Sequence, residues 1–182
     1  MTEFYIFKFV IMRYATIKKY DISNGSGIRT SFYCTGCTHH CCECFNSELW
    51  DFNIGKSFTK EVYESKIRPT INKHIAGISI LGGEPMHPNN LIATDQLIKW
   101  FKEDFSDKTI WLWSGYTINE LLNKSNPNYE MNFDIIKHID VLVDGRYVDE
   151  LRDLTLKWRG SSNQRVINVK ASFEQNKVVL WE

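Results

Sequence analysis

The sequence has no cysteine outside one short segment. All five cysteines lie between Cys34 and Cys44, and the remainder of the 182-residue chain contains none. A disulfide framework spreads its cysteines so that they join distant segments, whereas clustered thiols are typical of metal binding in a reducing compartment. With 43% hydrophobic residues the chain can also bury a core without disulfides. The composition therefore excludes a disulfide-stabilised secreted domain and indicates one domain with a metal site.

The sequence also lacks an excess of charge of either sign and lacks any long hydrophobic run. Lysine plus arginine and aspartate plus glutamate each number 22, so net charge gives no attraction to nucleic acid or membranes. No apolar stretch approaches the roughly 20 residues that a membrane-spanning helix needs. Residues 1–11 are apolar but lack the basic region and cleavage site of a secretory signal. We therefore expect a cytoplasmic protein that binds neither nucleic acid nor membranes.

Strand and helix patterns alternate along the chain, which predicts an α/β fold with a mostly parallel sheet and crossover helices. A capping box at Thr117 is expected to begin one short helix. Residues 123–132 are predicted to form a surface loop. The chain is too short for the eight strand–helix units of a full barrel. Strands are expected at residues 4–11, 14–20, 28–33, 77–81, 109–113, 140–143, 165–169 and 177–181, and helices at 59–75 with a break at Pro69, 91–105 and 133–138.

The most distinctive loops each follow a predicted strand. They come after Tyr33, Leu81, Trp113 and Val143. Because ligands gather at the carboxyl ends of parallel strands, one edge of the sheet should hold the site.

Three cysteines, Cys37, Cys41 and Cys44, have the spacing C-x3-C-x2-C. Thiolates held this close can converge on one soft metal centre, and three of them leave one metal position open for a ligand. A structural zinc site completed by Cys34, His39 or His40 is an alternative that the spacing leaves open.

A second motif is Gly82-Gly83-Glu84-Pro85, after the predicted strand at 77–81. It can be a tight strand-to-helix turn. It lacks the lysine and the serine or threonine of a phosphate loop, so a nucleoside-triphosphate site is a poor interpretation.

These motifs together resemble those of the radical S-adenosylmethionine enzymes, and in particular the glycyl-radical activating enzymes that act on anaerobic ribonucleotide reductase. The cysteine spacing alone indicates only the superfamily. The resemblance extends from about Met12 to Arg165 and includes residues 24–29, 44–46, 81–85, 110–116, 141–145 and 156–165. The last two segments, in this order, favour the reductase-activating family.

The resemblance implies a partial, open (β/α) barrel formed by one radical S-adenosylmethionine domain over residues 12–182. Residues 1–11 would be an N-terminal extension, or translation would start at Met12. It assigns a [4Fe-4S] cluster to Cys37, Cys41 and Cys44 and gives Cys34 and Cys42 no role. S-adenosylmethionine would contact the backbone at Glu43, Cys44 and Phe45, and also Gly82, Gly83 and Glu84, whose carboxylate would accept a hydrogen bond from the ammonium group.

The activity implied by the resemblance is reductive cleavage of S-adenosylmethionine, whose 5′-deoxyadenosyl radical forms a glycyl radical near the C-terminus of the large reductase subunit. A one-electron donor such as reduced flavodoxin would supply the electron. Residues 158–165 have the features of an ordered surface loop and are a candidate partner contact. The alternatives are an activating enzyme of the pyruvate formate-lyase type, a small-molecule radical enzyme, and a zinc-stabilised binding module without redox activity.

Overall fold

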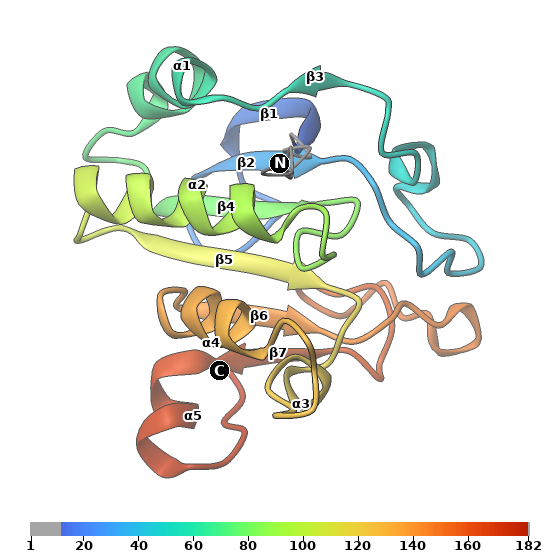
Figure 1. Cartoon of the computed structure of the whole chain (residues 1–182). Helices are drawn as coiled ribbons and strands as arrows, with labels where there is room; N and C mark the ends of the chain where they lie inside the picture. The colour runs from blue at the N-terminus through green and yellow to red at the C-terminus, as the bar shows by residue number, and fades with distance from the viewer. Residues whose placement is uncertain (1–11, 182) are drawn as a thin grey trace, which may run out of the picture.

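The structure is a computed structural model that describes residues 12–181. The strand expected at residues 4–11 lies outside the described residues. Seven strands form one open sheet in the order β3-β1-β2-β4-β5-β6-β7 (Figure 1). The strands are β1 Arg13–Asp21, β2 Arg29–Cys34, β3 Lys56–Ser57, β4 Gly77–Gly82, β5 Thr109–Ser114, β6 Val141–Asp144 and β7 Arg165–Asn168.

The four central strands, β2, β4, β5 and β6, are parallel to one another. The outer strands β1, β3 and β7 pair in the antiparallel direction. The expected α/β class is therefore confirmed, and the sheet is mixed. Every residue of β2 and of β6 is buried, as expected for parallel strands that are covered on both faces.

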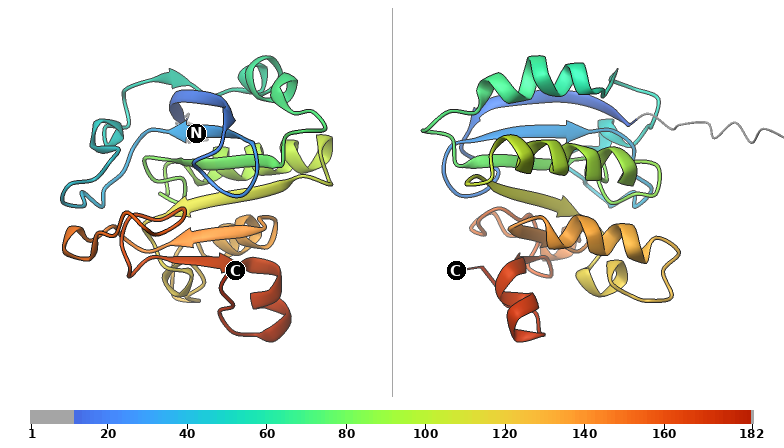
Figure 2. Two further views of the ribbon diagram at one scale, coloured as in Figure 1. Left: turned by 180° about the vertical axis from the view of Figure 1, so that it is seen from behind. Right: turned by 60° about the vertical axis from the view of Figure 1, so that its left-hand side comes forward.

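Two long helices cover one face of the sheet, α2 Leu91–Asp104 and α4 Tyr129–Lys137 (Figures 1 and 2). Leu97 and Ile98 of α2 each lie about one turn before Phe101, so the three side chains share one helical face, and they pack into the main core. Within residues 12–181, no such helix covers the opposite face of the sheet. It carries a smaller cluster in which Trp158 and Trp181, from loops, pack on Trp111.

The remaining helices are short. Thr59 caps α1 Lys60–Val62, as its position predicted, by accepting a hydrogen bond from Val62 N. The Thr117 capping box is confirmed at the start of α3 Ile118–Leu121. The other short elements are a π-helical turn at Tyr63–Ile67, 3₁₀ turns at Ser47–Leu49, Arg68–Thr70 and Asp149–Leu151, and α5 Val169–Gln175.

Three predicted elements were wrong in part. The helix expected to reach residue 75 ends at Thr70, because Pro69 lacks an N–H and the Thr70 hydroxyl bonds back to Ile67 O. The loop expected at residues 123–132 contains the first turn of α4, in which the buried Asn132 side chain donates to Leu121 O. The strand expected at residues 177–181 forms only an isolated bridge, since the Ser172 hydroxyl accepts from Val179 N.

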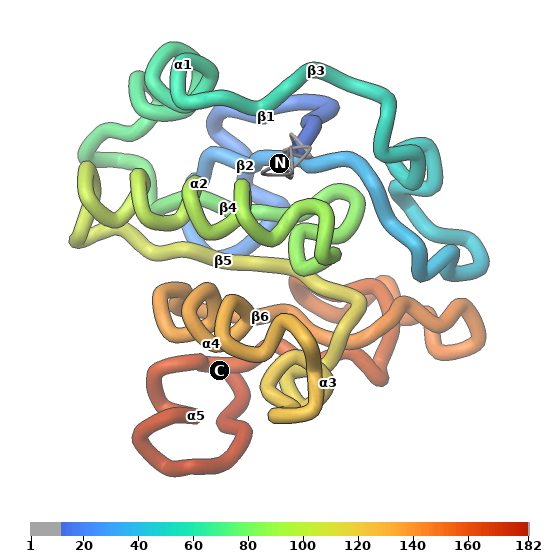
Figure 3. The backbone as a smooth tube through the Cα atoms, in the orientation of Figure 1, coloured from blue at the N-terminus to red at the C-terminus, as the bar shows by residue number. Residues whose placement is uncertain are grey.

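The carboxyl ends of the parallel strands lie at one edge of the sheet, at the right of Figure 1. The tube in Figure 3 shows the loop after β2 and the loop after β6 running beside each other at this edge. Within the part of the chain that the structure describes, no helix has the length and apolar character to cross a membrane.

Candidate metal centre

The loops that follow β2, β4, β5 and β6 meet around a pocket of about 140 Å³. The expectation that these loops gather at one edge is confirmed. Cys37, Cys41 and Cys44 all line this pocket. From the other loops it is lined by Gly82, Gly83, Glu84, Ser114, Gly115 and Gly145.

Backbone hydrogen bonds hold the cysteine loop at both ends. At its start, Gly36 N donates to Leu49 O at 2.7 Å and Cys37 N donates to Trp50 O at 3.0 Å. Near its end, Cys44 N donates to Cys41 O at 3.3 Å, which closes a turn. The loop therefore brings its three spaced cysteines to one pocket.

Burial raises the pKa of the Cys37 thiol to about 11, and the negative charges of Glu84, Cys41 and Cys44 add to this effect. The amide N–H of His39, 3.5 Å from the Cys37 sulfur, lowers the pKa of Cys37 in part, because it donates a hydrogen bond to that sulfur. Burial also raises the pKa of Cys41. The metal-free site thus keeps the thiols of Cys37 and Cys41 protonated at neutral pH, and metal binding to them must release those protons.

The spacing of the three thiols bears on the kind of metal group that this pocket could hold. Among the residues that the structure describes, no three His, Cys, Asp or Glu side chains are close enough together to hold one metal ion. A tetrahedral zinc ion with Zn–S bonds of 2.3 Å draws its sulfur ligands to within about 4 Å of one another. An iron–sulfur cluster is larger than one ion, so its thiolate ligands lie farther apart than those around a single zinc ion.

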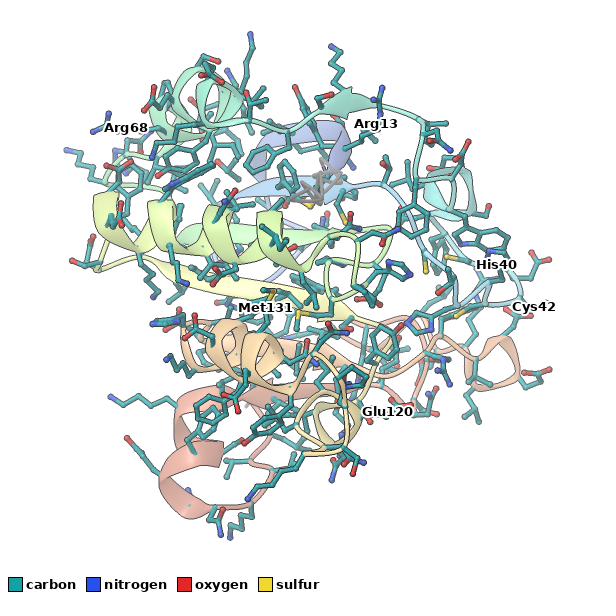
Figure 4. All side chains as sticks on the ribbon, in the orientation of Figure 1. Arg13, His40, Cys42, Arg68, Glu120 and Met131 are labelled. Atoms are coloured by element: carbon teal, nitrogen blue, oxygen red, sulfur yellow. The ribbon has the colours of Figure 1, made fainter. Side chains whose placement is uncertain are left out.

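The other two cysteines do not line this pocket. Cys34 is fully buried in the main core, where burial raises its pKa, so it packs as a small apolar residue. It does not complete a four-cysteine site. Cys42 is exposed and lies at the outer edge of the loop in Figure 4.

Both glycines of the β4 turn are required by close packing on the cysteine loop. Gly82 has φ of +112°, and a Cβ there would lie 2.5 Å from Cys34 O. A Cβ on Gly83 would lie 2.6 Å from Gly36 O. Glu84 N donates to the same Gly36 oxygen at 2.8 Å. The two glycines thus form the predicted tight turn and also allow it to pack against the start of the cysteine loop.

The Glu84 carboxylate is buried and accepts four hydrogen bonds from the chain itself. Its Oε1 accepts from Met86 N at 2.9 Å and Ser114 Oγ at 2.8 Å. Its Oε2 accepts from Gly115 N at 2.7 Å and His39 Nε2 at 3.0 Å. These donors use the four acceptor positions of a carboxylate. The expected contact of this carboxylate with an ammonium group would therefore have to compete with donors already in place.

The loop after β6 is fixed by Asp144 and Gln164. Asp144 is fully buried and pairs with the Arg165 guanidinium through two bonds of 2.9 and 2.6 Å, which raises the pKa of Arg165. The Gln164 side chain donates to Gly145 O and accepts from Gly160 N, both at 2.9 Å. The loop at residues 158–165 is therefore ordered against the rim of the pocket.

A groove of about 500 Å³ continues from this pocket over the open face of the sheet. Phe45 lines this groove with 62% of its surface exposed, and its ring packs against Tyr147. Glu43 is exposed and lines neither the pocket nor the groove. The residues common to pocket and groove are Cys44, Asn46, Leu81, Trp113, Tyr147 and Gln164.

Sequence reasoning did not identify the roles of His39 and Ser114 in binding Glu84. The signal that could have found them is chemical, because a buried carboxylate needs donors and these two residues lie in loops predicted to converge.

Comparison with known proteins agrees with this site. Residues 23–167 match the family model described as a 4Fe-4S single cluster domain. The chain is 39% identical over 155 residues to a protein of Vibrio cholerae, covering 84% of this chain and 96% of that one. Identity is 36% to a protein of Escherichia coli, covering 87% and 100% of the two chains, and 34% to one of Enterobacteria phage T4, covering 85% and 93%.

All three relatives carry the name anaerobic ribonucleoside-triphosphate reductase-activating protein. The similarity spans nearly the full length of each relative. The chain therefore belongs to the family of anaerobic ribonucleoside-triphosphate reductase-activating proteins.

Proposed function

We propose that this protein activates an anaerobic ribonucleoside-triphosphate reductase by reductive cleavage of S-adenosylmethionine at a [4Fe-4S] cluster. The observation that carries the proposal is the convergence of Cys37, Cys41 and Cys44 on one pocket, in a chain that matches a 4Fe-4S domain and belongs to this family. When bound, the reduced cluster and S-adenosylmethionine supply the 5′-deoxyadenosyl radical that removes hydrogen from a glycine of the reductase.

Cys37, Cys41 and Cys44 are the proposed ligands of the cluster. Their thiols line a single pocket, while Cys34 is buried in the core and Cys42 faces solvent. Three protein ligands leave one iron of a cubane open. The raised pKa of Cys37 means that the protein must give up at least this proton as the cluster assembles.

S-adenosylmethionine is proposed to lie between two loops. The backbone of Glu43, Cys44 and Phe45 would contact it on one side and Gly82, Gly83 and Glu84 on the other. The closeness of the β4 turn to the cysteine loop supports this placement, since Gly83 N and Glu84 N both donate to carbonyls at residues 34–36. We propose that Glu84 stabilises the ammonium group mainly by its charge, because its oxygens already accept four hydrogen bonds from the chain.

The groove beside the pocket is the proposed entrance for the reductase. Hydrogen transfer requires near contact, so the glycine near the C-terminus of the large subunit must reach the pocket. The groove leads there along Leu81 and Trp113, whose apolar side chains limit access of water. The ordered loop at residues 158–165 forms part of its wall. A reduced flavodoxin is the proposed electron donor.

We also propose that the fold is a partial, open barrel of the radical S-adenosylmethionine type. Its support is the parallel centre of an open sheet with its long helices on one face. We propose that residues 12–182 are one such domain, and that residues 1–11 are an extension or lie before the true start. Free cysteines clustered in one loop support a reducing compartment such as the cytoplasm.

The test is an anaerobic activation assay with the large reductase subunit, S-adenosylmethionine and reduced flavodoxin. The expected result is a glycyl radical in the electron paramagnetic resonance spectrum together with free methionine. Cys37→Ala protein and a reductase whose radical glycine is replaced by alanine are the controls. A radical on pyruvate formate-lyase but not on the reductase would favour the alternative activating enzyme. Bound zinc without cleavage of S-adenosylmethionine would favour the binding module.

A further inference from the structure

His39 lies where the four strand-end loops meet. It belongs to the cysteine loop, between Cys37 and Cys41, and 7% of its side chain is exposed. Its ring contacts the β4 turn at Glu84, the β5 loop at Tyr116 and the β6 loop at Arg146. The ring centroids of His39 and Tyr116 are 4.4 Å apart in an edge arrangement.

The hydrogen bonds determine which nitrogen of His39 carries the proton. Arg146 Nε lies 3.0 Å from His39 Nδ1, and a guanidinium N–H can only donate. Nδ1 is therefore the acceptor, and Nε2 carries the hydrogen that it donates to Glu84 Oε2 at 3.0 Å. A hydrogen bond to a carboxylate is among the stronger kinds. His39 thus joins the β6 loop to the β4 turn by accepting a hydrogen bond from Arg146 and donating one to Glu84.

Gly115 of the β5 loop lies close against the His39 ring. A Cβ on Gly115 would lie 2.3 Å from His39 Cδ2, so the ring occupies the space that any side chain at Gly115 would need. Gly115 N and His39 Nε2 donate to the same oxygen of Glu84. The ring is therefore held by close packing against Gly115 and by hydrogen bonds at both nitrogens.

We infer that His39 is a positioning residue, which sets the cysteine loop against the Gly82-Gly83-Glu84 turn and so determines the width of the S-adenosylmethionine site between them. This inference rests on the proposed function. The adjacent histidine provides the contrast, since His40 is exposed and stacks on Trp50 at a centroid distance of 4.7 Å. Within residues 12–181, the hydrogen bonds that Glu84 and Arg146 form with a histidine go to His39 and not to His40.

The test uses two substitutions, each of which keeps one of the two hydrogen bonds of the His39 ring. In His39→Gln the amide nitrogen reaches the place of Nε2 and can donate to Glu84. In His39→Asn the amide oxygen takes the place of Nδ1 and can accept from Arg146, while the bond to Glu84 is lost. His40→Asn is the matched control, because asparagine tolerates the positive φ of 49° at that position.

Each protein is reconstituted with iron and sulfide, and its cluster content, its dissociation constant for S-adenosylmethionine and the change in its spectrum on adding S-adenosylmethionine are measured. We expect His39→Asn to retain the cluster but bind S-adenosylmethionine about tenfold more weakly or worse, since a charge-assisted bond is lost. His39→Gln should bind within about threefold of the wild type. Equal affinities for His39→Asn and His40→Asn, or no recovery in His39→Gln, would overturn the inference.

A second measurement does not depend on the cofactors. In the metal-free proteins, His39→Asn should lower the thermal midpoint by at least about 2–4 °C relative to His40→Asn. Equal midpoints would show that the contact does not hold the loops together and would contradict the inference. If His39→Asn yields no folded protein, the comparison is made with Gly115→Ala, whose Cβ would displace the His39 ring from Glu84 and should weaken S-adenosylmethionine binding to the same extent; unchanged affinity would contradict the inference. Failure of the wild type to bind S-adenosylmethionine would instead refute the proposed function.

Discussion

Glu84→Gln tests whether a buried carboxylate holds the strand-end loops together. A glutamine has one oxygen, which can keep two of the four hydrogen bonds, and an NH₂ group that faces the other two donors. The least costly orientation directs this NH₂ toward Ser114, whose hydroxyl can turn to accept, and leaves Met86 N without a partner. The unpaired buried N–H costs about 1–3 kcal/mol, and each of the two remaining bonds loses about 1 kcal/mol with the charge. The sum is a destabilisation of about 3–5 kcal/mol.

The assay is thermal unfolding of the metal-free protein under reducing conditions, which removes any contribution from bound cofactors. For a chain of this size, about 2–4 °C of midpoint corresponds to 1 kcal/mol, so the expected decrease is about 6–20 °C. The exposed Glu150 is the matched control, and Glu150→Gln should leave the midpoint unchanged. A decrease of less than about 2 °C for Glu84→Gln would refute the assignment of Glu84 as the centre of this network.

Three further predictions concern the cysteines and one glycine. Cys37→Ala should lose both the cluster and activation, whereas Cys42→Ala should keep both; activation by the first variant would disprove the ligand assignment. Gly115→Ala should weaken S-adenosylmethionine binding as His39→Asn does, because the new Cβ displaces the ring, and unchanged affinity would contradict this. In metal-free protein, iodoacetamide should label Cys42 at pH 7.5 and Cys37 only as the pH approaches about 11, since burial raises the Cys37 pKa and the thiolate is the reactive form. Equal labelling of Cys37 and Cys42 at pH 7.5 would contradict the raised pKa of the Cys37 thiol.

The sequence was sufficient to predict the class of the fold and the edge that carries the site. The central strands were recognisable because β4 and β6 contain short apolar runs and β2 carries β-branched and aromatic residues, and the Thr117 capping box marked a helix start that the structure contains. The three cysteines and the Gly-Gly turn were visible because their chemistry depends on close spacing along the chain.

Features that depend on contacts between distant residues could not be predicted in the same way. Asn132 looked like a loop residue, yet it is buried because Leu121 O, eleven positions earlier, needs a donor. The segment at residues 177–181 has the composition of a strand, but the Ser172 hydroxyl takes the N–H of Val179. His39 could not be connected to Arg146, since 107 residues separate them and only the fold brings them to 3.0 Å.

The most direct test of the account is the electron paramagnetic resonance spectrum of the reconstituted, reduced protein with and without S-adenosylmethionine. The account predicts a [4Fe-4S] signal that changes when S-adenosylmethionine is added, because one iron remains open to it. A cluster signal that stays the same would contradict the open iron. The absence of any cluster signal, together with stoichiometric zinc by metal analysis, would show that Cys37, Cys41 and Cys44 form a structural metal site instead.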